Sequence, residues 1–272
     1  MKVAALQYKY HFPQSFDCYK KQIADIVQSY ANQKVDLLVF PEYAGMDMLA
    51  FTDIEGICKD LPFYEDLFEE LSNQHQMMIC SGTIVVHDKG KMFNRSYLFC
   101  PNQKATYQDK CMTTPYEVDE GIISRGNFLH THETSFGKIG ICICYDVEFP
   151  SFVKAHIDGG AKVIIVPSYT STLHGFYRVF LSCRARAIEN QCYVIQSAQI
   201  GQTDIEMTYG AAAICAPVDE PFPEDGLLAM GSMNQEGAAI ADLDFSLIEQ
   251  VRAFGQTRNF LDGQNLIDFN KG

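Results

Sequence analysis

The sequence predicts a layered α/β fold, and three observations lead to this prediction. Short apolar runs typical of buried strands, such as "KVAALQY" at 2–8 and "DLLVFPE" at 36–42, alternate with segments of helical periodicity. Two strands around an Asp-Lys-Gly turn in "MMICSGTIVVHDKGKMFNRSYLFC" at 77–100 add an antiparallel hairpin. No linker, repeat or low-complexity stretch divides the 272 residues, so we expect one domain over 1–272.

The other elements follow from local patterns along the chain. Apolar residues recur at helical spacing from Phe16 to Tyr30, and a second helix is expected at 62–75. Residues 109–127 show no periodicity and are predicted to form a loop. After it we expect a strand ending at Cys144, a helix at 149–158 closed by Gly159-Gly160, and a strand at 161–168. Then come a helix at 175–190, a strand at 191–198, the strands "YGAAAICAP", "LLAMGSM" and "EGAAIADLD", and a last helix at 244–253.

Composition restricts the classes of partner. The formal net charge of −13 argues against nucleic acid or an anionic membrane, because both require a basic face. The ten cysteines are scattered without a Cys-x-x-Cys pair, which favours free thiols in a reducing, cytoplasmic setting. We see neither a signal peptide at the start nor a run of membrane-spanning length.

The segment "GKIGICICYDVEFP" at 137–150 contains two cysteines one residue apart. In an extended strand, period-two alternation places Cys142 and Cys144 on the face opposite the isoleucines. Cys144 stands at the predicted carboxyl end of the strand, where open α/β sheets bind their ligands. Cys142 lies one step deeper and is expected to pack in the core. Asp146 is expected to brace the turn that follows.

Three chemically suited residues stand at strand ends or in the adjoining loop: Glu42 in "FPEYAG", Lys110 in "YQDKCMTTPYE", and Cys144. Each alone is more typical of a capping, solvated or packing residue. A cysteine nucleophile, however, needs an ammonium that lowers its pKa, a base for its proton, and a donor for the developing oxyanion. Glutamate, lysine and cysteine supply these roles without a histidine.

On these residues the sequence resembles the nitrilase superfamily of carbon–nitrogen hydrolases. The likeness spans almost the whole chain through "FPE", the Lys110 loop, "GKIGICICYD", "GAKVIIVPS", "RARAIENQCYV" and "ADLD", in this order. The resemblance implies a four-layer α-β-β-α sandwich, a homodimer and no cofactor. It also implies that Glu42 is the general base, Lys110 the oxyanion-stabilising cation and Cys144 the nucleophile. Glu117 would help to position substrate, and the Tyr145 N–H would be the second oxyanion donor.

Within the superfamily, "DKCMTTPYE", "CYDVEFP" and "ENQCYV" resemble a little-characterised bacterial branch. Some members of that branch are fused to an acetyltransferase domain, which these 272 residues lack. The activity implied is hydrolysis of a small linear amide through a cysteine thioester, with release of ammonia or an amine. A nitrile or an N-carbamoyl compound would use the same residues.

Other residues near the three candidates have two interpretations each. Glu148 either caps a helix that begins at Pro150 or faces the substrate. Tyr43, Tyr116 and Tyr145 flank the candidates and either line a pocket or pack. "HTHE" at 130–133 would put two histidines on one strand face, but no further ligands complete a set, so we expect no metal.

Two further functions compete with the amidase. A papain-like protease would need a histidine partner and a signature around its cysteine, and neither is recognisable. A non-catalytic binding protein on the same fold should have lost Glu42, Lys110 or Cys144, and all three are present. Faster labelling of Cys144 than of the other nine cysteines by a thiol alkylator would separate an enzyme from such a scaffold.

Overall fold

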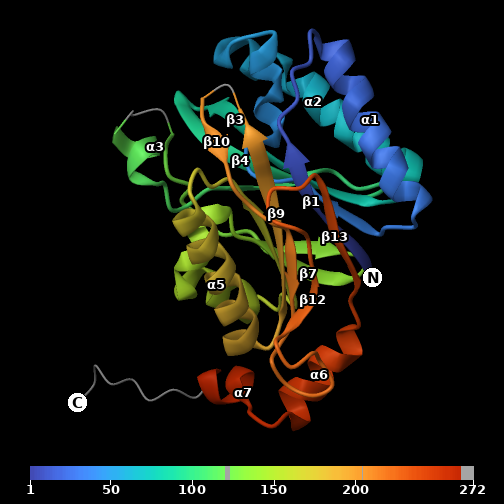
Figure 1. Cartoon of the computed structure of the whole chain (residues 1–272), viewed down its shortest axis with the longest axis vertical. Coiled ribbons are helices and arrows are strands. Elements are labelled where there is room, and N and C mark those ends of the chain that lie inside the picture. Colours follow the sequence, from blue (N-terminus) through green and yellow to red (C-terminus); the bar gives the residue numbers. More distant parts are fainter. Residues whose placement is uncertain (120–122, 204, 265–272) are drawn as a thin grey trace.

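One path of hydrogen-bonded strands runs through the molecule in the order β5-β4-β3-β2-β1-β9-β8-β7-β6. The structure is a computed structural model that describes residues 1–119, 123–203 and 205–264 (Figure 1). The strands on this path are β1 Lys2–Lys9, β2 Leu37–Val39, β3 Met78–Asp88, β4 Lys91–Phe99, β5 Thr106–Asp109, β6 His132–Thr134, β7 Gly137–Ile141, β8 Val163–Ser168 and β9 Tyr193–Gln202. Beside them, β13 pairs with β1, and β10 and β11 pair with β9.

The path divides into two halves, which are joined along the path by hydrogen bonds between β1 and β9. Their parallel register covers three residue pairs, from Gln7↔Ala198 to Lys9↔Ile200, at the end of β1. So short a ladder leaves the two halves free to fold face to face. Four strands lie off this path: β10 Met207–Thr208, β11 Ala213–Cys215, β12 Leu227–Met230 and β13 Gly237–Asp242. Of these, β12 pairs with β11.

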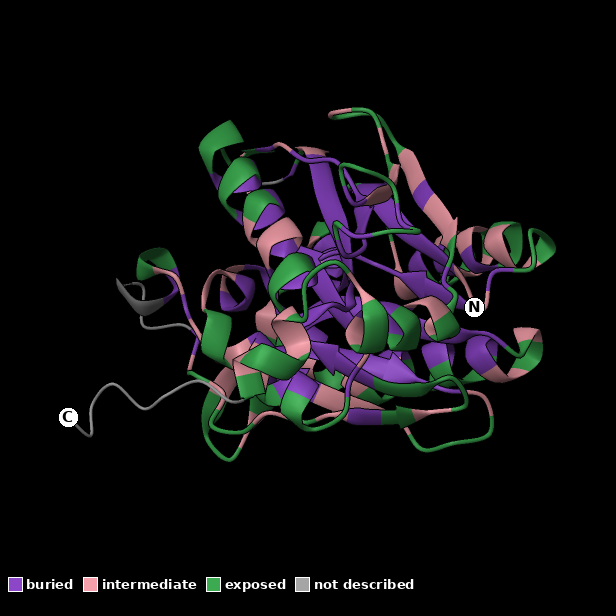
Figure 2. Cartoon of the chain, turned by 90° about the horizontal axis from the view of Figure 1, so that it is seen from below, coloured by how far each residue is buried: buried purple, intermediate pink, exposed green. Residues whose placement is uncertain are grey.

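Alternation along the strands explains how the layers form. In β1, Ala4 and Leu6 pack into one hydrophobic cluster with helices α1 Phe16–Asn32 and α2 Ile54–His75, whereas Val3 and Ala5 pack into the other with β8 and β9. Helices α4 Pro150–Asp158 and α5 Leu173–Asn190 cover the opposite side of the second half. The buried strands lie between helices with exposed outer faces (Figure 2). The predicted four-layer α-β-β-α sandwich is therefore confirmed.

Helix boundaries follow local capping. The Ser15 hydroxyl accepts a hydrogen bond from the Cys18 N–H at the start of α1, and Thr172 does the same for the Gly175 N–H at the start of α5. The second helix begins eight residues earlier than the expected 62–75, at Ile54, because Asp53 caps it. Two helices close the described chain, α6 Phe245–Phe254, which matches the expected 244–253, and the unexpected α7 Asn259–Gln264.

Three predictions of local structure were wrong. The predicted loop at 109–127 contains the short helix α3 Pro115–Asp119, and its residues 120–122 lie outside the described ones. The strand expected to end at Cys144 ends at Ile141, and Cys144 opens a 3-10 helix, η2 Cys144–Glu148. In "HTHE", β6 begins only at His132, so the two histidines do not share a strand face.

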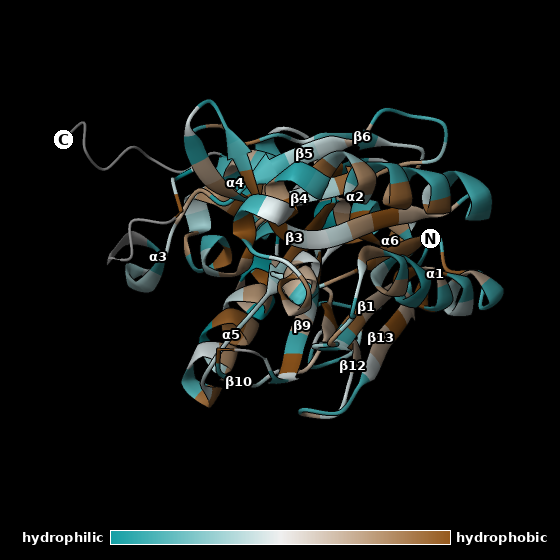
Figure 3. Ribbon diagram, turned by 90° about the horizontal axis from the view of Figure 1, so that it is seen from above, coloured by the Kyte–Doolittle hydropathy of each residue, from teal (hydrophilic) through white to brown (hydrophobic). Residues whose placement is uncertain are grey.

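Hydrophilic and hydrophobic residues are interspersed along the helices, which are not uniformly hydrophobic (Figure 3). Across the ranges that the structure describes, no helix combines the length and the apolar character needed to cross a membrane.

Candidate active site

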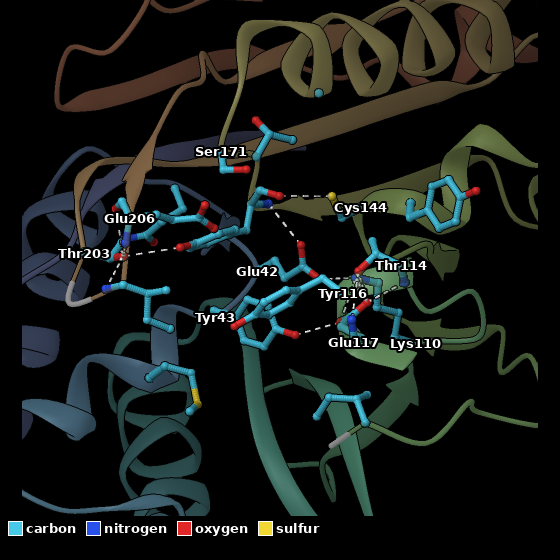
Figure 4. Close-up of a pocket in the computed structure, with 18 of the residues that line it drawn as sticks. Glu42, Tyr43, Lys110, Thr114, Tyr116, Glu117, Cys144, Ser171, Thr203 and Glu206 are labelled. Atoms are coloured by element: carbon cyan, nitrogen blue, oxygen red, sulfur yellow. Dashed lines mark hydrogen bonds and ion pairs between the residues drawn. The ribbon is translucent and has the colours of Figure 1, made fainter. Parts of the chain in front are cut away.

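All six residues proposed from the sequence for the site line one cavity of about 480 Å³. The cavity opens where the Lys110 loop, the segment after β2 and the start of η2 come together, so residues distant in the sequence face one another (Figure 4). The six are Glu42, Lys110, Glu117, Cys144, Tyr145 and Glu148.

Glu42 lies in the short connection between β2 and the 3-10 helix η1 Ala44–Ala50. The next residue, Tyr43, adopts a left-handed backbone with φ 62° and donates its N–H to the Thr83 hydroxyl at 2.8 Å, which fixes the turn. The Glu42 carboxylate is buried. It accepts hydrogen bonds from Lys110 Nζ at 2.7 Å, Asn94 Nδ2 at 2.9 Å and the Tyr169 N–H at 3.1 Å.

Lys110 follows β5 and is only 2% exposed. Its ammonium lies between two carboxylates, 2.7 Å from Glu42 Oε1 and 2.9 Å from Glu117 Oε2. Burial by itself would lower the pKa of Lys110, but the negative charges of the two carboxylates, above all that of Glu42, outweigh burial and hold it above its usual value. Lys110 therefore stays charged in a site shielded from water.

Glu117 lies in the first turn of α3 and, like Glu42, forms an ion pair with Lys110. It accepts hydrogen bonds from the Tyr43 hydroxyl at 2.7 Å and from the Thr114 N–H at 2.7 Å. Burial alone would raise the pKa of Glu117, but Lys110 and these hydrogen bonds bring it below its usual value. The result is an ionised carboxylate with a fixed orientation.

Cys144 reaches the cavity because the chain leaves the strand direction just before it. Its φ of 47° lies in the left-handed region, which non-glycine residues rarely adopt and which occurs preferentially at functional sites. The thiol donates to the Tyr169 carbonyl at 3.5 Å, and the Glu42 carboxylate lies near enough to raise its pKa. The completely buried Cys142 lies behind it in the core.

The charge state of the Cys144 thiol differs from the sequence prediction. The Lys110 ammonium lowers its pKa, as expected, but burial and the Glu42 carboxylate raise it by more, so the pKa lies well above the usual value. Burial also raises the pKa of Glu42. The resting site therefore holds a neutral thiol beside a carboxylate whose affinity for a proton is increased.

Asp146 braces the turn after Cys144, as predicted. Its carboxylate accepts N–H hydrogen bonds from Ile143 at 3.0 Å and Met112 at 2.6 Å, and a longer one of 3.2 Å from Cys111. These bonds connect η2 to the Lys110 loop. The Tyr145 N–H lies in the first turn of η2. N–H groups at this position have no partner within the helix and can donate a hydrogen bond to an anion.

Glu148 is not a helix cap. The residue at the N-cap of α4 is Phe149, which makes no side-chain capping bond, and Glu148 instead pairs with Arg178 at 3.5 Å on the cavity wall. The tyrosines also line the cavity, including Tyr116, which is 63% exposed.

Sequence reasoning missed three residues that the structure brings to the site: Asn94, Tyr169 and Arg178. Asn94 lies in β4, where its neighbours are strand-forming, and Tyr169 follows β8. Tyr169 comes just after a buried strand, as Glu42 does, and this position in the sequence could have indicated that it belongs to the site.

No group of three or more histidine, cysteine, aspartate or glutamate side chains able to hold a metal occurs among the residues that the structure describes. The buried His132 of "HTHE" has a hydrogen bond to Thr106 at 2.7 Å, and burial lowers its pKa to about 3.

This fold, with a glutamate, a lysine and a cysteine meeting in one buried cavity, defines a class of hydrolase that acts on carbon–nitrogen bonds. The sequence model of the carbon–nitrogen hydrolase family matches residues 2–253, and the chain belongs to this family. Among its relatives, a probable hydrolase, YhcX, from Bacillus subtilis is 31% identical over 96% of this chain. A deaminated glutathione amidase from Synechocystis is 29% identical over 69% of this chain and 72% of its own.

Solved structures show the same fold. The carbon-nitrogen hydrolase from Helicobacter pylori superposes with a TM-score of 0.83 at 18% identity, covering 100% of this chain and 97% of its own. Nit3 from Saccharomyces cerevisiae gives 0.79 at 23% identity and 93% coverage of both chains. The chain spans about half the length of the Bacillus relative, 53%.

Proposed function

We propose that this chain hydrolyses small linear amides, with Cys144 as nucleophile, Glu42 as general base and Lys110 as oxyanion-stabilising cation. The observation that carries the proposal is the position of Glu42 in a buried cavity, where its carboxylate accepts a hydrogen bond from the Lys110 ammonium and lies close enough to the Cys144 thiol to raise the pKa of that thiol. A base must lie close to the proton that it removes, and Glu42 meets this condition.

The proposed reaction has two halves. As Cys144 Sγ attacks the amide carbon, its proton passes to Glu42, and the carbonyl oxygen becomes an oxyanion held by Lys110 Nζ and the Tyr145 N–H. Collapse of this intermediate breaks the C–N bond, and Glu42 returns the proton to the leaving ammonia or amine. Water then attacks the thioester, Glu42 takes its proton, and the acid leaves as the thiol re-forms.

The raised pKa of both groups suits this exchange. The thiol holds its proton at rest, and a glutamate made more basic by burial can accept this proton as the substrate is attacked. Glu117 contributes by fixing Lys110 and, through Tyr43, the wall of the cavity.

The relatives favour an amide as substrate over a nitrile or an N-carbamoyl compound, because several of them are named as amidases. They include deaminated glutathione amidases and an omega-amidase, NIT3, of Saccharomyces cerevisiae. We further propose that the chain belongs to the bacterial branch in which some members carry an acetyltransferase domain. Its support is the motif "DKCMTTPYE" and the greater length of the Bacillus relative.

Ammonia release over a panel of linear amides, nitriles and N-carbamoyl amines tests the function. We expect turnover of amides, its loss in Cys144→Ala, and little or no turnover of nitriles. Faster release from nitriles or carbamoyl compounds would contradict the amide assignment. Failure to turn over any of them, with Cys144 alkylated no faster than the other cysteines, would favour the non-catalytic scaffold.

We also propose that two copies of the chain form a homodimer through the outer face of α5. Four apolar side chains spaced along this helix are exposed by 37% to 56%: Leu173, Tyr177, Leu181 and Ile188. An apolar stripe of this kind is typical of a protein interface. Light scattering at micromolar concentration should give about twice the chain mass of 30.6 kDa, and Leu181→Glu should give a monomer. A wild-type monomer would contradict the proposal.

A further inference from the structure

The cavity extends beyond the catalytic residues to a second polar end, and Tyr169 connects the two. The backbone of Tyr169 contacts the reaction centre, where its N–H donates to Glu42 and its carbonyl accepts from Cys144. Its hydroxyl lies 3.3 Å from Thr203 Oγ1 and near enough to the Glu206 carboxylate for that charge to raise the pKa of the tyrosine. Figure 4 shows Thr203 and Glu206 together at this end of the cavity. The distance between the two ends is therefore about the length of one tyrosine side chain.

Two side chains of the cavity, one of them at this second end, offer hydrogen-bond acceptors. Glu206 is half-buried in the turn between β9 and β10 and, among the residues that the structure describes, makes no ion pair with a lysine or arginine. Gln199 of β9 also lines the cavity and is 1% exposed, and neither its Oε1 nor its Nε2 has a hydrogen-bond partner in the described part of the chain. Such a buried carboxamide is costly unless a ligand or water satisfies it.

Among the described residues, every carboxylate on the cavity wall contacts a cation except one at this end. Lys110 serves both Glu42 and Glu117, and Arg178 serves Glu148. Glu206 is the remaining carboxylate on the cavity wall within the described ranges. A half-buried carboxylate with no cationic partner on the wall of a cavity favours a cationic ligand.

The wall between the two ends suits a chain of methylene groups. The rings of Tyr43 and Tyr169 meet edge to face at 5.6 Å, and Met46 and Leu49 line the same cavity. These side chains offer apolar contact and no charge. Rotation of the Gln199 carboxamide can present its Oε1 to a ligand, because the two ends of the group have the same shape.

We propose that Glu206 and Gln199 form a subsite for a cationic nitrogen, an ammonium or a guanidinium. The substrate is then a linear amide with a positive charge at the end remote from the scissile bond, joined to it by an apolar spacer about as long as a tyrosine side chain. This inference rests on the proposed amidase function. The experiments below distinguish a failure of that function from a failure of the subsite.

Three amides of similar length separate the possibilities: δ-aminovaleramide, which is cationic, hexanamide, which is neutral, and glutaramate, which is anionic. We expect kcat/KM to be highest for δ-aminovaleramide, about tenfold or more above hexanamide, since a hydrogen bond to a charged group contributes this much. Glu206→Gln should reduce the ratio of the two values by about tenfold to a hundredfold. The exposed Glu224→Gln, which makes the same change in net charge, should leave the ratio unchanged.

Preference for glutaramate, or a ratio that Glu206→Gln does not reduce, would overturn the subsite. If none of the three amides is turned over, the failure belongs to the proposed function, and binding then tests the subsite. Calorimetric titration of the Cys144→Ala variant with n-pentylamine should show binding that Glu206→Gln weakens by about tenfold. No binding of the amine, or binding that Glu206→Gln leaves unchanged, would also overturn the inference.

Discussion

Cys144→Ala is expected to lower turnover by at least about 10⁴-fold, the scale seen when a hydrolase loses a member of its catalytic unit, whereas Cys142→Ala should retain activity close to wild type. Both cysteines lie in one strand-and-turn segment, yet their surroundings differ. Cys144 contacts Glu42 and the Tyr169 carbonyl at the cavity. Cys142 is completely buried in the hydrophobic core between sheet and helices.

Cys142 cannot substitute for its neighbour because its environment has the wrong chemistry. Burial raises the pKa of the Cys142 thiol well above its usual value, and Asp146 adds to the increase. Its conversion to alanine removes one buried sulfur atom, so we expect a loss of about 1 kcal/mol in the free energy of unfolding. The effect of Cys142→Ala should therefore appear in stability and not in turnover.

Mass spectrometry of enzyme trapped with substrate locates the intermediate. Cleavage after Lys138 and Lys154 gives one peptide with both cysteines, and fragmentation between them assigns the acyl group. We expect it on Cys144. An adduct on Cys142, or Cys144→Ala with substantial turnover, would show that the nucleophile has been misassigned.

Lys110→Arg is expected to fold but to be nearly inactive, with turnover reduced on the order of a hundredfold to a thousandfold. The substitution keeps the positive charge, so it separates charge from geometry. If Lys110 acted only through its charge on the thiol, arginine would preserve most of the activity.

The geometry around Lys110 leaves little room for a guanidinium. The ammonium is buried and lies within 3.0 Å of both Glu42 Oε1 and Glu117 Oε1. A planar fork is larger and would displace these carboxylates or the oxygen of the substrate. Since Glu42 also contacts the thiol, a shift of its carboxylate disturbs the base as well as the oxyanion site.

Steady-state turnover of Lys110→Arg measures the loss of activity, and its thermal unfolding temperature shows whether the variant is folded. Lys154→Arg is the matched control, because Lys154 lies on the surface in α4, paired with Asp158, and should retain full activity. Lys110→Ala leaves two buried carboxylates without their cation and is expected to lose about 3–5 kcal/mol of stability. If it does not fold, Cys144→Ala provides the inactive reference. Lys110→Arg with turnover within about tenfold of wild type would contradict the proposed oxyanion site.

Local sequence patterns determined most of the elements of this protein. Helical periodicity placed α1 and α5, the Gly-Gly pair marked the end of α4, and apolar runs located β1 and β8. These patterns are reliable because they depend on neighbours within one or two turns. Errors arose where a local signal was ambiguous: Asp53 starts α2 well before the expected residue, and the alternation in β7 continues in the sequence past Ile141, where the backbone leaves the strand.

The chemistry of a cysteine nucleophile, together with the resemblance, was enough to select Glu42, Lys110 and Cys144 from the sequence. What only the tertiary structure decided is how they meet and in what charge state. Lys110 and Glu42 are 68 residues apart, and Tyr169 donates to Glu42 across 127 residues, so no local pattern could report these contacts. The neutral resting state of the thiol likewise depends on burial and on carboxylates contributed by other segments, and pKa values respond to surroundings in space, not in sequence.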